Sequence, residues 1–382
     1  MPSLPIYLDH HATTPVDARV LERMLPYFSQ TFGNPASATH AWGWKAKDAV
    51  EAARREVASL VGALAKEIVF TSGATESNNL AMQGAWHARD QSRSRVVVSS
   101  IEHKSILDCA ERLRADGADV VIAPVTREGL VDLDALRGVV DGQTAFVCVM
   151  AANNEIGTVQ PLAAIGDITR AAGALFVVDA AQAAGKVPLD VTDMQVDLLS
   201  LTGHKFYGPK GCGALFVRKR VTIDPIVVGG GQERGLRSGT LNVPGIVGLG
   251  AACAVAQADM SAEAARVSAL RDRLLGGLIE TIAGITTNGS MTSRLPHNLH
   301  VNIQGIDGEA LLVALDDIAI SSGSACASSS GEPSHVLRAI FGAEPVPKAA
   351  IRFGLGRSTT AEDIDYTISK LAKVVARLRH PS

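Results

Sequence analysis

The sequence predicts an α/β protein, with a larger domain built on a mostly parallel sheet and a smaller α+β domain after it. Three observations predict this. Short apolar runs alternate with amphipathic segments over the first two thirds of the chain, the pattern changes after Ala258, and 382 residues suffice for two domains of ordinary size. Strands that alternate with helices need crossover connections, which place a parallel sheet between two layers of helices.

Seven apolar runs are the candidate strands of the larger sheet. Between several of them lie amphipathic segments such as Lys104–Arg114 and Leu162–Ala172. The connection from Leu199 to Ala214 leaves little room for a helix, so we expect an antiparallel edge strand there. The seven runs are Ile68–Phe70, Val96–Val98, Val120–Ile122, Ala145–Met150, Leu175–Val178, Val196–Leu199 and Ala214–Val217.

The last third of the chain has a different order of elements. A capping-box pair, Thr359 and Glu362, is expected to begin the final helix, whose apolar residues then share one face. The elements before it are a long helix over about Ser261–Ile282, a strand at Asn298–Ile303, a helix near Glu309–Leu315 and a strand at Ile351–Leu355.

Charge and composition exclude several classes of protein. The chain has 36 basic and 39 acidic residues and a net charge of −3, so no broadly basic surface for nucleic acid or anionic membrane is expected. The longest uncharged stretch, Ser238–Ala258, contains Asn242, Pro244 and several glycines, which argues against a membrane span. Met1–His11 shows no secretory signal pattern, so we expect a cytoplasmic protein.

The five cysteines are scattered, and no two form a C-x-x-C pair. A disulfide framework and a zinc ribbon are therefore poor interpretations, and no metal site is predicted. Cys326 lies among Ser, Gly and Ala in Ser321–Gly331, where a thiol is available for reaction; an incidental loop cysteine is the alternative. The other four are predicted to be packing residues: Cys109, Cys148, Cys212 and Cys253.

Function in an open α/β sheet concentrates in the loops at the carboxyl ends of the strands. After the first candidate strand, Thr71–Asn79 brings hydroxyl residues and a Gly into a helix, whose backbone N–H groups suit a phosphate. An ordinary helix N-cap is the alternative. No Walker or dinucleotide glycine motif follows a strand, which disfavours nucleoside triphosphates and dinucleotides.

Three later strand ends carry charged or titratable side chains. His103 follows the second strand, and it is a candidate catalytic residue only if other strand-end loops also carry reactive side chains. Asp179 ends an apolar run, where a carboxylate needs either an internal ion pair or a cationic ligand atom. Lys205, beside His204 among glycines and aromatic residues, is a candidate Schiff-base nucleophile. A phosphate cradle, a carboxylate for a pyridinium nitrogen and a Schiff-base lysine together predict pyridoxal 5'-phosphate.

The chain resembles the cysteine desulfurases, pyridoxal-phosphate enzymes of the class V aminotransferase group, and specifically those with a long Ser-Ser-Gly-Ser-Ala-Cys loop. The resemblance implies the type I fold, with a seven-stranded large domain (16–258) and a small domain (1–15 and 259–382) that carries the cysteine loop. The motifs that carry it are Tyr7–Pro15, Phe32–Ser37, Thr71–Asn79, Glu102–Lys104, Asn153–Gly157, Asp179–Gln182, Gly203–Lys205, Gly229–Thr240, Ser321–Cys326 and Ile351–Gly354.

The resemblance also implies how the cofactor is held. Lys205 would form the Schiff base and act as the proton-transfer base, Asp179 would pair with the pyridinium nitrogen, and Gln182 would contact the phenolic oxygen. His103 would stack on the ring. The phosphate would be held by Ala74, Thr75, Thr202 and His204, and by Thr240 of a neighbouring subunit, which implies a homodimer.

Substrate and product are implied in the same way. Asn154, Arg352 and Asn34 would bind L-cysteine, with the guanidinium gripping its carboxylate. Cys326 would take the substrate sulfur as a persulfide, L-alanine would leave, and the sulfur would pass to a scaffold, a carrier or a thiolation enzyme. Iron–sulfur cluster assembly and thio-modification of tRNA or DNA stay open, with no membrane or direct nucleic-acid contact expected. The alternatives are a selenocysteine lyase or another aminotransferase-fold enzyme, and a non-catalytic sulfur-carrying adaptor.

Overall fold

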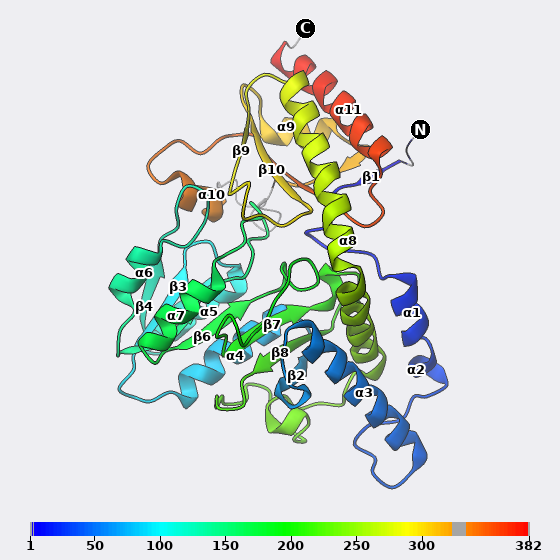
Figure 1. Ribbon diagram of the computed structural model, residues 1–382, viewed down its shortest axis with the longest axis vertical. Helices are drawn as coiled ribbons and strands as arrows, with labels where there is room; N and C mark the ends of the chain where they lie inside the picture. Colours follow the sequence, from blue (N-terminus) through cyan, green and yellow to red (C-terminus); the bar gives the residue numbers. More distant parts are fainter. Residues whose placement is uncertain (1, 3, 323–333, 381–382) are drawn as a thin grey trace.

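The computed structural model describes residues 2, 4–322 and 334–380, and a seven-stranded sheet lies at its centre (Figure 1). The strand order across this sheet is β2-β8-β7-β6-β5-β3-β4. Each of the seven predicted apolar runs forms or overlaps one of these strands. Their bounds are β2 Ile68–Thr71, β3 Arg95–Ser99, β4 Asp119–Ala123, β5 Thr144–Cys148, β6 Leu175–Asp179, β7 Leu198–Thr202 and β8 Gly213–Val217.

The sheet is mostly parallel, as predicted, and β8 runs against all the other strands. The prediction that β8 is an edge strand is wrong. β2 pairs antiparallel with its free side, in a register that places Ile68 opposite Phe216, and β2 forms the edge. An antiparallel strand added to a sheet leaves a row of unpaired N–H and C=O groups, and β2 satisfies them here.

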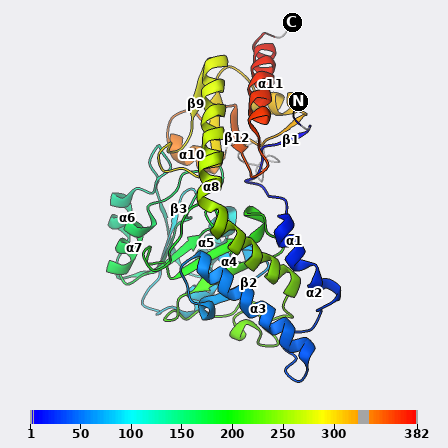
Figure 2. The same ribbon diagram turned by 45° about the vertical axis from the view of Figure 1, so that its right-hand side comes forward.

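Helices cover both faces of the sheet, because neighbouring side chains along each buried strand point to opposite faces. In β3, Val96 and Val98 pack in one apolar core while Val97 packs in the other. Helices α4 (Ala74–Ala88) and α5 (Lys104–Ala115) contribute to the first core. The second core is covered by α3 (Ala41–Leu60), α6 (Leu133–Val139), α7 (Leu162–Ala171) and part of α8 (Val243–Thr281), with α1 (Ala18–Met24) and α2 (Pro26–Ser29) beside α8 (Figure 2).

Helix α8 is longer than the predicted Ser261–Ile282 and begins at Val243. Asn242 caps it through its side chain, and Pro244 sits in the first turn, where a missing N–H is tolerated. The uncharged residues that begin it are helical because they pack on α3, so closely that a Cβ on Gly250 would lie 2.6 Å from Ala53 Cα. Within the described residues α8 alone has the length and apolarity to cross a membrane, and 61% of that apolar window is buried inside the protein.

A separate apolar core surrounds the distal half of α8, beside both chain termini (Figure 1). It unites Ile6 and Leu8 from the start of the chain with residues that follow Val267. A two-stranded parallel sheet pairs β1 (Ile6–Tyr7) with β11 (Ile318–Ala319). The remaining elements there are β9 (Ile285–Thr287), β10 (Asn298–Ile303) and β12 (Ala350–Gly354) in an antiparallel sheet, and α9 (Gly308–Ala314), α10 (His335–Phe341) and α11 (Ala361–Arg379).

The capping box of α11 lies one residue later than predicted. Thr360 is the N-cap: its backbone N–H donates to Asp363 Oδ2 at 2.9 Å, and Asp363 N–H donates to Thr360 Oγ1 at 3.2 Å. Thr359 instead accepts a hydrogen bond from Gly356 N–H at 2.9 Å and closes the preceding turn. Three short 3-10 helices complete the fold: η1 Ala65–Glu67, η2 Gly203–Lys205 and η3 Glu233–Gly235.

Candidate functional site

A cavity of about 690 Å³ lies at the carboxyl ends of the parallel strands. Its walls come from the loops after β2, β3, β5, β6 and β7, from residues 11–13 and from β12. The structure therefore brings together residues that the sequence placed on separate strand ends. The predicted site residues that line it are Ala74, Thr75, His103, Asn154, Asp179, Gln182, Thr202, His204, Lys205 and Arg352.

Two predicted site residues within the described part of the chain are not part of this lining. Asn34 and Thr240 are exposed and do not line the cavity of their own chain. Cys326 lies outside the described residues. The other four cysteines are all buried, which confirms their predicted role in packing.

One corner of the cavity is built to receive an anion. Helix α4 begins there, and its N-cap, Gly73, offers no side chain to occupy the first-turn N–H groups. These groups and the positive end of the helix dipole favour a phosphate. β8 approaches this turn so closely that a Cβ on Gly213 would lie only 2.6 Å from Gly73 Cα. Only a glycine fits at this position of β8. Thr202 adds a hydroxyl group to the same lining.

His204 enters this corner as a neutral side chain. Burial, followed by the charges of Lys205 and Lys210, lowers the pKa of the imidazole to about 4. Its Nδ1 lies 3.2 Å from the hydroxyl of Thr13. At neutral pH the ring therefore serves as a hydrogen-bonding group and adds no charge.

Asp179 supplies a buried carboxylate at the end of β6, where it is 4% exposed. Oδ2 accepts from Asn78 Nδ2 at 2.8 Å, and Oδ1 accepts from Ala181 N–H at 2.9 Å. Among the described residues no cationic side chain forms an ion pair with it, so the internal ion pair considered from the sequence is not found. A buried carboxylate held only by neutral donors suits a cationic ligand atom.

Lys205 reaches the cavity from η2, directly after β7. Its Nζ donates to the carbonyl oxygens of His11 and Ala12 at 2.7 and 2.8 Å. These two residues belong to the segment 10–17, which we call the N-terminal strap. Thr14 of the strap donates from its hydroxyl to His204 O at 3.0 Å and accepts from Tyr207 N–H at 2.7 Å. The strap and the lysine segment are thus bonded to each other on both sides of Lys205.

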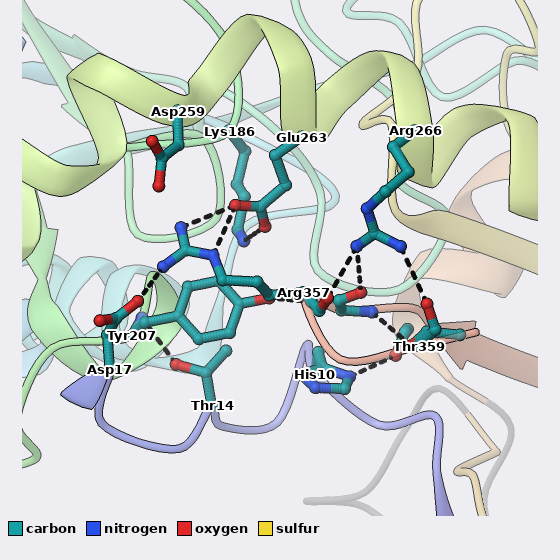
Figure 3. A network of polar contacts seen from close by, with 12 residues as sticks. His10, Thr14, Asp17, Lys186, Tyr207, Asp259, Glu263, Arg266, Arg357 and Thr359 are labelled. Carbon is teal, nitrogen blue, oxygen red and sulfur yellow. Dashed lines mark hydrogen bonds and ion pairs between the residues drawn. The ribbon is translucent and has the colours of Figure 1, made fainter. Parts of the chain in front are cut away.

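A polar network behind the strap holds this arrangement (Figure 3). The hydroxyl of Tyr207 accepts from Arg357 N–H at 2.6 Å, and the Arg357 guanidinium lies over the Tyr207 ring. The same guanidinium pairs with Glu263 of α8 and with Asp17 of the strap. Lys186 also pairs with Glu263, at 3.5 Å, and burial lowers the pKa of its ammonium to about 8. The network ties α8, the strap and the lysine segment together.

His103 is the N-cap of α5, and its ring nitrogen Nδ1 accepts from Ser105 N–H at 3.1 Å. The residue before it, Glu102, is fully buried, and burial raises the pKa of its carboxyl to about 8. Glu102 Oε1 accepts from Ser99 Oγ at 2.5 Å and from Met150 N–H at 2.7 Å. This carboxyl links the ends of β3 and β5 beside His103 and Met150, which line the cavity.

Arg352 projects from β12 and is only 3% exposed. Nη1 donates to Asn154 O at 2.8 Å, and Nη2 pairs with Asp9 Oδ1 at 2.7 Å. Its buried Nε has no hydrogen-bond partner in the described part of the chain. A buried N–H without an acceptor lowers the stability of the fold, and an anionic ligand bound here would supply the missing acceptor.

Among the side chains that line the cavity but were not predicted as site residues are His11, Glu155 and His335. Glu155 is buried, its pKa is raised to about 7 by burial, and it accepts from Ser334 Oγ at 2.6 Å. The strand-end rule could have found it, because it follows β5 closely. His335, whose Nε2 lies 2.9 Å from Glu102 O, and His11 have no such local signal, since each comes from a distant part of the chain.

The lining fits pyridoxal 5'-phosphate on structural grounds. An uncapped helix N-terminus can hold the phosphate, a buried carboxylate without a cationic partner among the described residues can face the ring nitrogen, and an amine lies in the same cavity. These are the three functional ends of that cofactor.

Comparisons with known proteins agree with this chemistry. The profile of the class-V aminotransferase family matches residues 6–367. A cysteine desulfurase IscS of Anaeromyxobacter sp. (strain Fw109-5) is 53% identical over 381 residues, covering 99% of this chain and 94% of that protein. A probable mitochondrial cysteine desulfurase of Dictyostelium discoideum is 51% identical over 380 residues, covering 99% of this chain and 84% of that protein.

Solved structures are similar over nearly the whole chain. A NifS-like protein superposes with a TM-score of 0.91 at 38% identity, covering 98% of this chain and all of that one. The protein SspA in complex with cysteine superposes with a TM-score of 0.80 at 37% identity, covering 92% of this chain and 98% of that one. The prediction of the type I fold is confirmed, and the chain belongs to the class-V aminotransferase family, in its cysteine desulfurase group.

Proposed function

We propose that this protein is a pyridoxal-phosphate-dependent cysteine desulfurase, which takes sulfur from L-cysteine, releases L-alanine and carries the sulfur as a persulfide on Cys326. The observation that carries the proposal is the convergence of an anion-binding helix terminus, a buried carboxylate, a lysine and a buried arginine on one cavity. The names of the relatives and the cysteine bound by SspA support it.

Pyridoxal 5'-phosphate, when bound, supplies an electron sink for the bonds that break at the substrate Cα. Asp179 keeps the ring nitrogen protonated, since its oxygens otherwise meet only neutral donors. With the cofactor bound, Gln182 would donate to the phenolic oxygen, and His103, at the start of α5, would stack on the ring. The phosphate is held by the first turn of α4 and by Ala74, Thr75, Thr202 and His204.

Lys205 holds the cofactor covalently and moves the proton at the substrate Cα. Its hydrogen bonds to the carbonyl groups of the strap keep Nζ at the cavity wall. Arg352 binds the substrate carboxylate, and its buried Nε is the N–H that gains an acceptor. Asn154, whose backbone carbonyl orients the guanidinium, lies beside it, and we place Asn34 on the approach to the same region.

Cys326 receives the sulfur. The C–S bond of cysteine breaks, an S–S bond to Cys326 forms, and the hydrogen of one thiol ends on the methyl group of alanine, so atoms balance without an added oxidant or reductant. Residues on either side of the undescribed segment 323–333 are bonded to the cavity wall. Ser321 pairs with Arg352, and Ser334 donates to Glu155. Cys326 lies between these two points in the sequence.

A homodimer completes the site, with Thr240 reaching the phosphate of the neighbouring subunit. Thr240 is exposed and outside its own cavity, as such a role requires. Large apolar side chains are exposed around α1–α3, among them Phe28 (61%), Phe32 (65%), Trp42 (49%) and Trp44 (54%), and such side chains mark protein interfaces. An active protein that sediments as one chain would refute the shared site.

We further propose a division into a large domain (16–258) and a small domain (1–15 and 259–382). The core that joins Ile6 and Leu8 to residues from Val267 onward supports this boundary.

The sulfur acceptor is a scaffold, a carrier or a thiolation enzyme that serves iron–sulfur cluster assembly or the thio-modification of tRNA or DNA. We place the reaction in the cytoplasm, while the relatives include a bacterial and a mitochondrial protein.

The test combines two variants of the cofactor-loaded enzyme. Cys326→Ser is expected to retain the yellow cofactor absorbance and to lose persulfide formation, and Cys109→Ser, at a buried packing cysteine, is the matched control. Lys205→Ala is expected to lose the borohydride-trappable linkage to the protein. Release of sulfide at the parent rate by Cys326→Ser contradicts the nucleophile, and alanine formation from selenocysteine but not cysteine indicates a lyase instead.

A further inference from the structure

His11 is a buried imidazole in the cavity wall, 1% exposed, and the mechanism above assigns it no role. Two close contacts limit the space around its ring. The His297 ring stacks on it with centroids 4.3 Å apart, and a Cβ on Gly354 would lie 2.8 Å from His11 Cδ2. Burial keeps the pKa of His11 well below its ordinary value, with the charge of Arg352 acting in the same direction, so the ring is neutral. A neutral imidazole carries one proton, and its neighbours decide which nitrogen holds it.

The position of that proton follows from a chain of hydrogen bonds that starts at Arg294. A guanidinium only donates, so the Asn298 atom that lies 2.7 Å from Arg294 Nη1 is the amide oxygen. The amide nitrogen of Asn298 therefore faces the other way, where it donates to Glu155 O at 2.9 Å and to His11 Nε2 at 3.0 Å. Because Nε2 accepts this bond, the proton of His11 is on Nδ1.

The same logic fixes the side-chain amide of Gln182. His11 Nδ1–H donates to Gln182 Oε1 over 3.2 Å, so the amide oxygen is the atom turned toward the ring. Gln182 Nε2 then donates one of its hydrogens to His11 O at 3.1 Å. The second N–H of Nε2 is not used by these two bonds, and Gln182 lines the cavity, so this N–H is available to a ligand there.

We propose that His11 is a positioning residue: its Nδ1–H holds the Gln182 amide so that an N–H group, and not the carbonyl oxygen, faces the phenolic oxygen of pyridoxal phosphate. The inference rests on the proposed function for the identity of the cofactor. Asn298 and Arg294 contribute to the same positioning, because their hydrogen bonds determine which nitrogen of His11 carries the proton. Without the His11 ring, only the backbone carbonyl of residue 11 still favours this orientation of the Gln182 amide. The amide then rotates more readily by half a turn and presents its oxygen to the phenolic oxygen, which repels it.

The test is the pH titration of the visible absorbance of the cofactor-loaded enzyme. A donor on the phenolic oxygen competes for the proton which that oxygen shares with the Lys205 nitrogen, so loss of the donor raises the midpoint of the titration. His11→Phe, which keeps a ring but has no N–H, is expected to raise it by about one pH unit. His11→Asn restores an amide N–H near the position of Nδ1 and is expected to titrate close to the parent.

A double-mutant cycle separates positioning from general loosening of the site. Gln182→Leu removes the donor itself, so His11→Phe is expected to add no further shift in that background. Parent-like titration of His11→Phe, or a full additional shift in the Gln182→Leu background, overturns the role of His11. His11→Met makes the same test if the phenylalanine variant does not fold. A parent enzyme that binds the cofactor and titrates but forms no alanine from cysteine contradicts the proposed function alone.

Discussion

The Asp179 carboxylate offers the sharpest test of the site. In Asp179→Asn the side chain keeps its shape but loses its charge. The two donors that face it, Asn78 Nδ2 and Ala181 N–H, both need an acceptor, and an asparagine oxygen can satisfy only one of them. Asn78 cannot turn its own oxygen inward without losing the hydrogen bond that it accepts from Ser200. The substitution therefore removes both the charge and one hydrogen bond.

The magnitude follows from the burial of the pair. Asp179 is 4% exposed, so the proposed interaction with a cationic ring nitrogen would be little screened by water. Removing one partner of a buried charge pair costs about 3–5 kcal/mol. At about 1.4 kcal/mol for each factor of ten, kcat/KM for L-cysteine is expected to fall by about 10²–10⁴.

The assay is alanine formation from cysteine at saturating cofactor, with cofactor occupancy measured from the absorbance. Asp197→Asn is the matched control, because Asp197 is equally buried on the same sheet but lies before β7, at the opposite end of the strands. There it accepts from Phe176 N–H and pairs with Arg218 and Arg220. The control is expected to lose stability and keep its activity for each bound cofactor. An Asp179→Asn enzyme with full cofactor and parent-like kcat/KM would refute the reasoning.

Two further predictions concern stability. The pKa of Glu102 is raised from 4.5 to about 8, so the folded protein keeps a proton that the unfolded chain loses, and its free energy of unfolding is expected to fall as pH rises across that window. Urea unfolding at several pH values measures this, and an equal slope in Glu102→Gln would contradict it. Glu233→Gln, which removes the buried charge partner of Arg54 and leaves only the more exposed Glu51, is expected to cost about 3–5 kcal/mol in the same assay. Asp365→Asn, in an exposed pair with Arg273, is its control and is expected to cost under about 1 kcal/mol.

The cofactor corner could be predicted because its residues follow strands. Asp179, His103 and Lys205 each stand at or just after the carboxyl end of a buried strand, and parallel strands bring those ends to one edge of the sheet. Position along the chain therefore implied position in space. The roles assigned to these residues stay predictions until the variants above are measured.

Local sequence could not place elements whose structure depends on distant contacts. Thr359 and Thr360 are each followed three residues later by an acidic residue, so two capping boxes were available. The hydrogen bond from Gly356 to Thr359 selects the second. The glycine-rich start of α8 has low helix propensity, and its burial against α3 makes it helical.

The sequence by itself determined the alternation of strands and helices, the family, and the ligand chemistry of the strand ends, because these depend on near neighbours and on periodicity. Only the tertiary structure decided that β2 covers the outer side of β8 and that the strap lies against Lys205. It alone brought His11, from the start of the chain, between Gln182 and Asn298. Such contacts join residues far apart in sequence, so neither local propensity nor periodicity predicts them.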